Sequence, residues 1–355
     1  MMPRLQQIPV VRDVYRLISR RVTAAAEAWD RFWFEPADPL LLGLLRLLTG
    51  GMLTYNLLVW GMDLEAFFGS QGLQPLQAVR ELYAGRPIFS FWLWLDDTAL
   101  RPAHLISLLI AVLFFLGVAS RFTAVLAFLV TISCSQRVPV ANFGLDQILA
   151  LLCLYLIVAP CGADFSLDAV IRRWWHRRAG RPLESGGSGR KSGAARVALR
   201  LIQLHLCAIY FCSGFAKLKG PSWWTGEAMW RVLANAEYQT VDLTWLAQWP
   251  WLPVLAAHVT ILWEIFFIVL VWNRSLRPLV LAIGIAMHLG IGAFLGMWTF
   301  GLIMTFAYLS FADPDVWRQR LERFAESCRT LRRTDGRKNR MDAYGLCHAA
   351  GDPES

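Results

Sequence analysis

The sequence predicts an all-α integral membrane protein: a polytopic bundle of about eight transmembrane helices preceded by an N-terminal interfacial amphipathic helix. Three observations predict it. Hydrophobic residues make up 56% of the 355 residues and charged residues 17%, and the mean hydropathy is +0.42, too apolar for an ordinary water-soluble domain. Several runs approach the roughly 18 apolar residues that a helix needs to cross a bilayer. The arginines gather in three blocks beside those runs.

The amphipathic helix comes first, over residues 10–33. Apolar side chains from Val11 to Trp33 recur along one side, and Arg12, Arg16 and Arg20 lie on another, which is typical of a helix in the headgroup layer. The apolar segments follow at 40–60, 102–118, 122–136, 144–161, 201–216, 255–272, 276–295 and 297–311. The first of them continues as a full span, so no cleavable signal peptide is expected.

Orientation follows from the basic residues. Arginines crowd residues 4–31, the loop 162–200 and the tail 313–355, whereas the loops 61–101 and 217–253 hold few cations. With eight spans the three basic blocks share one side, which the positive-inside rule makes cytoplasmic, and seven spans would separate them. We therefore expect a multi-pass protein of the cell (inner) membrane with both termini cytoplasmic. Its parts would be an interfacial helix (1–36), a transmembrane domain (37–312) with a flexible loop (162–200), and a basic tail (313–355).

Charge and cysteine content narrow the expected partners. The net charge of +9 reflects arginines attracted to anionic headgroups, so the lipid bilayer is an expected partner and nucleic acid is not. The seven cysteines form no Cys-x-x-Cys pair, and five lie within or at the ends of predicted spans. Neither a disulfide framework nor a metal site is expected. Residues 179–196 are rich in glycine and serine and are predicted to be a flexible linker.

Tryptophan is the next unusual feature, with 17 in the chain. Many stand at span ends or in the loops expected outside, where an aromatic belt at the membrane interface accounts for most of them. These loops are nevertheless more apolar than loops in water. They are expected to fold back over the bundle and roof a pocket that opens toward the outer leaflet. Trp223 and Trp224, in the loop after the fifth span, are candidates for lining it.

Lysine is rare, and its placement is informative. Of the 35 cationic side chains only Lys191, Lys217, Lys219 and Lys338 are lysines. Arginine keeps its charge, whereas a desolvated lysine can lose its proton and act as a base or nucleophile. Lys217 and Lys219 end the fifth predicted span. They are candidates for amine chemistry, or for side chains that reach into the headgroups and have no further role.

Ionisable residues inside spans are costly in lipid and mark candidate sites. Lys217 and Asp146 are expected near the outer boundary, with Glu264 and His288 about 12 to 15 Å deeper. The four could converge in the outer half of the membrane. A purely structural ion pair, for example Arg46 with Glu264, is the competing interpretation, because buried charges need partners whether or not they catalyse.

Helical periodicity refines two of these positions. At about 100° per residue, Gln203, Tyr210 and Lys217 fall on one face of the fifth span with Ser213 beside them. This face is predicted to form a polar seam leading to Lys217, and to line the pocket. In the seventh span, His288 lies among glycines repeated every four residues, a pattern that lets helices approach closely. It is predicted to be either a satisfied buried histidine or a tuned acid or base.

The stretch that contains Lys217 carries a resemblance. Tyr210-Phe-Cys-Ser-Gly-Phe-Ala-Lys-Leu-Lys-Gly-Pro-Ser-Trp-Trp-Thr-Gly226 resembles the segment in which vitamin K-dependent gamma-carboxylases, and their bacterial relatives in the horizontally transferred transmembrane (HTTM) family, carry a catalytic lysine followed by a tryptophan and a glycine. Segments 33–46, 68–75, 164–168 and 287–297 are similar to other marks of this family. Together the segments span most of residues 30 to 312.

The resemblance implies a reaction and its cofactors. It places the general base on Lys217, assigns charge stabilisation to His288, and implies a reduced quinone as cofactor, with O₂ and CO₂ as co-substrates and a glutamate-containing peptide as acceptor. Two hypotheses follow. One is a quinone-dependent carboxylase or related lyase-type enzyme that works at the outer face. The other is a non-catalytic HTTM membrane protein that binds lipid or peptide, or assists the maturation or export of a partner.

Overall fold

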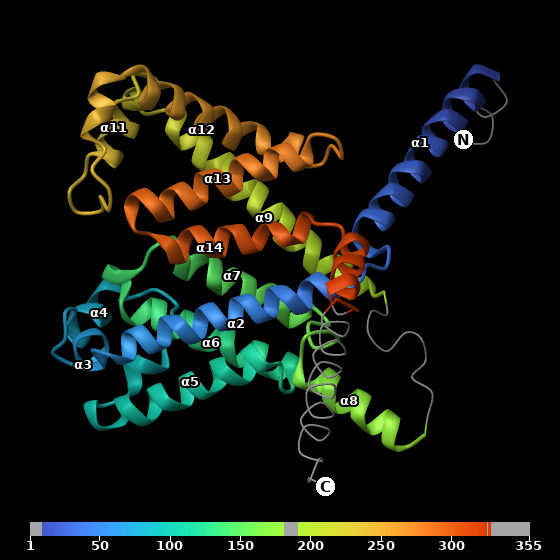
Figure 1. Cartoon of the computed structure of the whole chain (residues 1–355). Coiled ribbons are helices and arrows are strands. Elements are labelled where there is room, and N and C mark those ends of the chain that lie inside the picture. The colour runs from blue at the N-terminus through green and yellow to red at the C-terminus, as the bar shows by residue number, and fades with distance from the viewer. Residues whose placement is uncertain (1–8, 181–190, 325, 328–355) are drawn as a thin grey trace, which may run out of the picture. The chain divides into compact units, whose positions relative to one another are not determined.

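The computed structural model describes residues 9–180, 191–324 and 326–327, and these residues are all-helical apart from connecting loops (Figure 1). Helix accounts for 78% of the structure and the described part contains no strand, only an isolated bridge between Ala37 and Ser192. The chain divides into two compact units, residues 1–311 and 312–355. The first unit contains the whole bundle and is described below.

The principal helices of this unit fall on the predicted segments, except α8, which forms within the predicted loop 162–200. They are α1 (Pro9–Phe34), α2 (Leu40–Gly61), α5 (Leu100–Leu116), α6 (Ser120–Arg137), α7 (Gly144–Val158), α8 (Leu167–Arg178), α9 (Gly193–Leu218), α12 (Trp251–Leu270), α13 (Arg277–Leu295) and α14 (Trp298–Ala307) with η6 (Tyr308–Phe311). Short helices occupy the two long loops: α3 (Leu64–Phe68), α4 (Leu76–Leu82), η2 (Phe91–Trp94) and η3 (Asp97–Ala99) in the first, and α10 (Pro221–Trp224), α11 (Glu227–Leu233) and η5 (Thr244–Gln248) in the second. The end of the bundle that carries these short helices is called the loop end.

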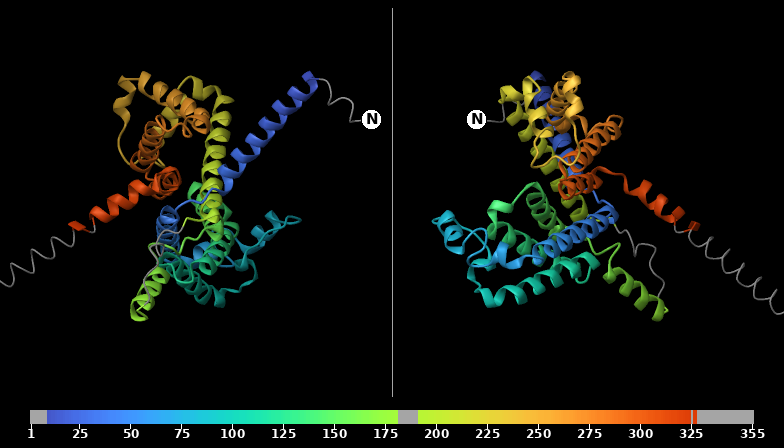
Figure 2. Two further views of the ribbon diagram at one scale, coloured as in Figure 1. Left: turned by 90° about the vertical axis from the view of Figure 1, so that its right-hand side faces the viewer. Right: turned by 60° about the vertical axis from the view of Figure 1, so that its left-hand side comes forward.

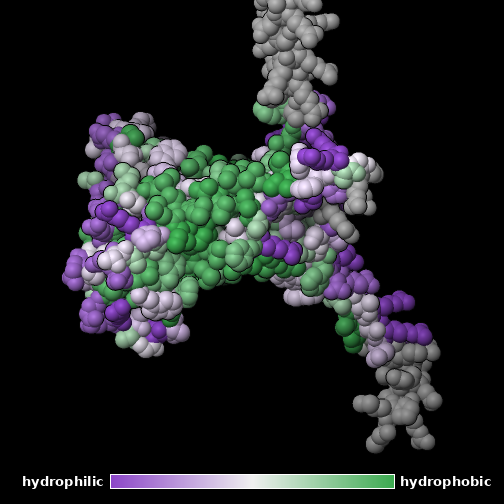
Figure 3. All heavy atoms as spheres, turned by 90° about the horizontal axis from the view of Figure 1, so that it is seen from below, coloured by the Kyte–Doolittle hydropathy of each residue, from purple (hydrophilic) through white to green (hydrophobic). Residues whose placement is uncertain are grey.

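Five helices are long and apolar enough to cross a membrane, which supports a bilayer environment. They are Leu40–Gly61, Asp97–Leu116, Gly193–Leu218, Trp251–Leu270 and Arg277–Leu295. Gly144–Val158 and Trp298–Phe311 are apolar but shorter, and α6 carries Arg121 and Arg137 at its ends. Figure 3 shows apolar side chains in a band across one face, with hydrophilic residues toward both ends. The all-α fold is therefore confirmed, with five helices compatible with a membrane, whereas the eight spans and the interfacial N-terminal helix stay predictions.

Close helix pairs build the core. Helix α9 packs along α12, α2 along α5, α6 along α7 and α13 along α14. The left view in Figure 2 shows α9 running from the end of α1 along the bundle, and α9 packs beside α12. Side chains from α2, α7, α9, α14 and η6 meet in one buried apolar cluster. The polar face of α9 is thereby enclosed by other helices.

Two buried arginines fasten the connections between helices. The guanidinium of Arg46 is fully buried and donates to the carbonyl oxygens of Phe114, Phe115, Cys161 and Phe165. The suggested Arg46–Glu264 ion pair is therefore wrong. Carbonyl oxygens freed where helices end need donors in an apolar medium, and a guanidinium supplies several from one side chain.

Arg137 does the same at the loop end. Its guanidinium is also fully buried and donates to the carbonyl oxygens of Phe68, Gly69 and Gln74, at 3.1, 2.6 and 3.0 Å. It holds the turn after α3 against the end of α6. Gly117, at the end of α5, shows how tight the Arg46 junction is: its φ is +71°, and a Cβ there would lie 2.7 Å from Nη1 of Arg46.

The loop 162–200 is not uniformly flexible. Residues 167–178 form helix α8, and α9 already begins at Gly193. Ser166 caps α8 by accepting from the amide of Ala169, and the carboxylate of Asp168 accepts from the amides of Ala119 and Ser120. These local caps outweigh the loop-like composition. Residues 181–190, which hold most of the predicted linker, lie outside the described residues, as does most of the tail 313–355.

The junction at Arg46 yields a prediction. Replacing Arg46 with methionine removes a donor from the carbonyl oxygens of Phe115, Cys161 and Phe165, whereas that of Phe114 keeps the amide of Gly117, and one buried unsatisfied polar group costs about 1–3 kcal/mol. We expect Arg46→Met to lower the free energy of unfolding in SDS titration by at least about 3 kcal/mol. Arg101→Met is the matched control. Arg101 forms one exposed ion pair with Glu65, which is worth about 0–1 kcal/mol. Equal losses in the two variants would contradict this role for Arg46.

Candidate functional site

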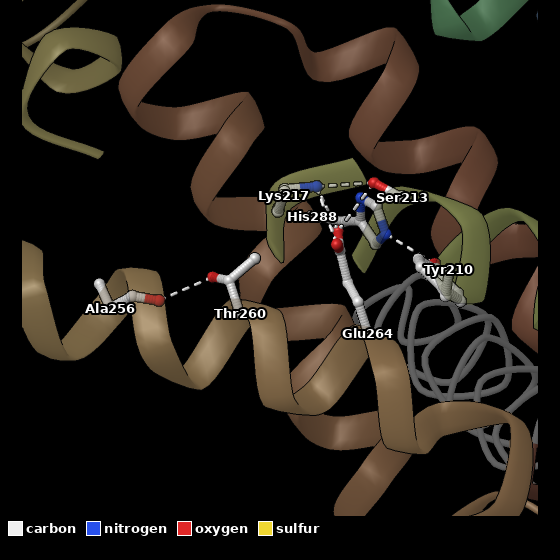
Figure 4. Close-up of polar contacts among 7 residues, drawn as sticks. All are labelled: Tyr210, Ser213, Lys217, Ala256, Thr260, Glu264 and His288. Atoms are coloured by element: carbon white, nitrogen blue, oxygen red, sulfur yellow. Dashed lines mark hydrogen bonds and ion pairs between the residues drawn. The ribbon is translucent and has the colours of Figure 1, made fainter. Parts of the chain in front are cut away.

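Lys217, in the last turn of α9, forms a buried ion pair with Glu264 of α12 (Figure 4). Its Nζ lies 2.8 Å from Oε2 and 2.9 Å from Oε1 of Glu264, and it donates to Oγ of Ser213 at 2.6 Å. The side chains of Lys217 and Glu264 are only 17% and 9% exposed. The ring of Trp223 lies under the amine, 5.1 Å from Nζ to the ring centroid. Lys217 is therefore enclosed and paired, and does not reach into solvent.

A glycine allows this pairing. Gly214, one turn before Lys217, faces α12 at the level of Glu264. A Cβ there would lie 3.1 Å from Cβ of Glu264 and 2.8 Å from Cγ1 of Ile265. Only glycine lets the two helices come this close, because small residues set the distance between packed helices. The short Ser213 and the long Lys217 then meet the carboxylate from the same side.

His288 belongs to a second group of hydrogen bonds, one to two turns below the first along α9. The hydroxyl of Tyr210 lies 2.7 Å from Nε2 of His288 and 2.5 Å from the hydroxyl of Tyr308. All three side chains are buried. Nδ1 of His288 is buried without a hydrogen-bond partner. The three side chains thus form a continuous series of groups that can exchange protons, and Nδ1 at its histidine end has no partner.

The two groups are neighbours. Ser213, which contacts Glu264 at 3.3 Å, stands between Tyr210 and Lys217 on the same face of α9. The charge of Glu264 lies within electrostatic range of the phenols of Tyr210 and Tyr308. Figure 4 shows His288 bonded to Tyr210, whose ring packs edge-on against Trp263, the residue before Glu264, with 4.7 Å between the ring centroids. Four predicted site residues, Lys217, Glu264, His288 and Tyr210, therefore lie in one region.

Gln203 and Asp146 lie elsewhere. Gln203 is on the predicted face of α9, but two turns below Tyr210, where its Nε2 donates to the carbonyl of Ser310. Asp146 lies in the first turn of α7, where it accepts from the amide of Phe143 and the side chain of Asn56. Its hydrogen bonds cap a helix and none of them goes to Lys217, so its expected convergence with Lys217 stays a prediction. Neither residue lines the Lys217 group.

The two tryptophans differ. Trp223 contacts the amine of Lys217, as given above. Trp224 donates to the carbonyl of Leu218 and stands edge-on to the ring of His258, and it is half exposed. His258 itself bonds to its own helix at the carbonyl of Val254. Only Trp223 belongs to the Lys217 group.

Sequence reasoning missed Tyr308. It completes the hydrogen-bond chain of Tyr210, and Gly284 of α13 makes room for its hydroxyl, 2.5 Å from where a Cβ would stand. A tyrosine within an apolar segment carries a polar tip that needs a partner, and this was the available signal.

A groove of about 820 Å³ opens at the loop end. Its lining includes Asn142, Arg231, Tyr238, Leu295 and Thr299. Leu295 lies seven residues after His288 on α13, or about 10 Å along the helix. The groove therefore opens on the same helix as the site, nearer the loop end. Among the described residues, no group of three metal-ligating side chains could hold a metal ion.

The ion pair can be tested without knowing its role. Lys217→Met or Glu264→Gln alone leaves an uncompensated charge or polar group in an apolar site, and each should cost about 2–4 kcal/mol of unfolding free energy. The double variant should cost less than the sum of the singles by at least about 1 kcal/mol. SDS titration of the four proteins gives this coupling. Lys219→Met, at the exposed neighbouring lysine, should leave the free energy of unfolding almost unchanged. Additive single effects would exclude the pairing.

The comparisons with known proteins identify no relative. No family model, curated protein or solved structure matches the chain. The function of the site has to be argued from its residues, and the resemblance of the Lys217 segment remains a hypothesis.

Proposed function

We propose that the chain is an integral membrane enzyme in which the Lys217–Glu264 pair takes a proton from a substrate. One observation carries the proposal: an amine and a carboxylate are held 2.8 Å apart inside an apolar bundle, beside a chain of buried groups that can exchange protons. Such placement is expensive in a membrane and is typical of functional residues.

The membrane arrangement that we propose has eight spans: α2, α5, α6, α7, α9, α12, α13 and α14 with η6. The three basic blocks then lie on the cytoplasmic side of the cell membrane, together with both termini, and α1 lies on the inner leaflet. The apolar helices and the arginine distribution support this topology. The loop end, with the groove of about 820 Å³, then faces outward.

The pair explains how Lys217 could act as a base. In a low-dielectric site, separated charges are no longer strongly favoured over a neutral amine beside a carboxylic acid. The ammonium proton of Lys217 can pass to Glu264 across the 2.8 Å contact. The free amine can then accept a proton from the O–H of a substrate. Ser213 orients Nζ by accepting from it, and Trp223 covers it.

From the resemblance of residues 210–226 we propose the reaction class, a quinone-dependent gamma-carboxylation. One feature supports a hydroquinone there: Nδ1 of His288 is buried without a partner, and a hydroquinone oxygen would supply one. When bound, a reduced quinone supplies, together with O₂, the strong base that removes a glutamate γ-proton before CO₂ adds. Lys217 would take the hydroquinone proton, and His288 would hydrogen-bond the developing negative charge.

A second function has its own supporting observation. Both carboxylate oxygens of Glu264 are occupied by Lys217, and Gly214 brings the helices into close contact. A pair satisfied so completely can serve as an interhelical lock. The chain would then be a non-catalytic membrane protein that binds lipid or peptide or assists a partner's maturation or export.

A substitution at Lys217 separates the two functions. Arginine keeps the charge and the pair but cannot give up its proton. We expect Lys217→Arg to lower carboxylation on the order of a hundredfold or more while the protein still accumulates in the membrane. Lys219→Arg is the matched control and should retain full activity. The measurement is mass spectrometry of co-expressed glutamate peptides for a CO₂ adduct, with and without reduced quinone.

The outcomes are distinct. An adduct that depends on quinone and on Lys217 supports the enzyme. An adduct that survives in Lys217→Arg would exclude Lys217 as the base. If folded wild-type protein yields no adduct on any peptide, carboxylation is excluded and the result supports the non-catalytic function.

A further inference from the structure

Helix α8 exposes an apolar stripe although it lies outside the predicted spans. Its members recur at helical spacing and are 38–61% exposed: Leu167, Val170, Ile171, Trp174 and Trp175. On a wheel of 100° per residue they fill an arc of about 140°, which Arg178 enters in the last turn. Within the described residues nothing covers this face, and exposing five large apolar side chains to water would be costly.

The remaining positions of α8 are strongly basic. They include Arg172, Arg173, His176, Arg177 and Arg178. Arg172 also donates to the carbonyl of Ala163, and Arg173, whose side chain is 40% exposed, lies 3.8 Å from the carboxylate of Asp164. The helix contains one acidic residue, Asp168, whose carboxylate is engaged by the amides of Ala119 and Ser120. The guanidinium of Arg178 lies 5.2 Å from the ring centroid of Trp174. Arginines beside an aromatic and aliphatic stripe are typical of helices that lie in the headgroup layer of anionic membranes.

The bundle fixes where α8 begins. Asp168 ties its first turn to the start of α6, and Arg46 bonds the carbonyl of Phe165 just before it. The N-terminus of α8 is thus held where α5 and α6 join, at an end of the apolar helices. Figure 1 shows α8 and α1 leaving this end in different directions. A short helix held at that level is placed to meet a membrane surface.

We propose that α8 lies in the headgroup layer of the inner leaflet, with its apolar stripe among the acyl chains and its arginines on anionic phospholipid headgroups. The surface of the helix complements such a leaflet in both polarity and charge. Twelve residues, about 18 Å, are too few to cross the bilayer but suffice for an in-plane anchor. This inference goes beyond the proposed reaction and does not depend on Lys217.

Hydrogen exchange of the full chain in lipid nanodiscs tests the inference. One set of nanodiscs contains phosphatidylcholine alone, and the other contains phosphatidylcholine with phosphatidylglycerol. Each basic residue near an anionic surface contributes about 1 kcal/mol, so we expect amides 170–178 to exchange at least about tenfold more slowly in the anionic nanodiscs. High salt should remove that difference.

Two variants locate the effect. Glutamine at Arg172, Arg173, Arg177 and Arg178 should abolish the difference between the two lipids, and serine at Trp174 and Trp175 should speed exchange in both. Glutamine at Arg86 and Arg101, exposed arginines of the first long loop, is the control and should leave α8 unchanged.

Three results would overturn the inference. The first is equal exchange of α8 in both lipids, and the second is a lipid difference that survives in the arginine variant. The third is protection in detergent that rises with protein concentration, because a second copy of the chain would then cover the stripe.

Discussion

The structure depends on one constraint: inside an apolar medium every charged or polar group must find its partner within the protein. Arg46 and Arg137 meet it with carbonyl oxygens, Glu264 with Lys217 and Ser213, and Tyr210 with a histidine and a second tyrosine. Each solution joins segments that are far apart in the sequence. The same bonds that remove the cost of burial therefore also define how the helices are arranged.

The constraint is met by two kinds of group: groups that only hold segments together, and groups that can also exchange a proton. The guanidiniums bind only backbone oxygens at helix junctions, and a permanent charge with several donors suits that task. The amine of Lys217 instead faces a carboxylate, to which it can transfer a proton. Segments 68–75 and 164–168 contact Arg137 and Arg46. In this chain their contacts hold loops in place, whereas the segment around Lys217 holds titratable groups.

Much of the helix bundle could be predicted from the sequence, because the length of an apolar run and its helical periodicity are local properties. Helices occupy all eight predicted apolar segments, and the face of α9 that contains Gln203 and Tyr210 is buried as the period indicates. Which helices pair with one another could not be predicted from the sequence. Glu264 could have met Arg46 or Lys217, and the choice depends on Gly214, whose missing side chain brings α12 against α9. Composition also failed at residues 162–200, where Ser166 and Asp168 start a helix in a stretch expected to be loop.

The central claim is that Glu264 controls the proton on Lys217. Competitive acetylation in nanodiscs tests it directly, because the chain has only four lysines and peptide mass spectrometry can compare Lys217 with the exposed Lys219 in the same molecule. The account predicts that Lys217 reacts more slowly than Lys219 in the native chain, and that Glu264→Gln raises the rate at Lys217 while leaving Lys219 unchanged. If the two lysines react alike in the native chain, or if Glu264→Gln leaves Lys217 unaffected, the carboxylate does not govern the amine and the account fails.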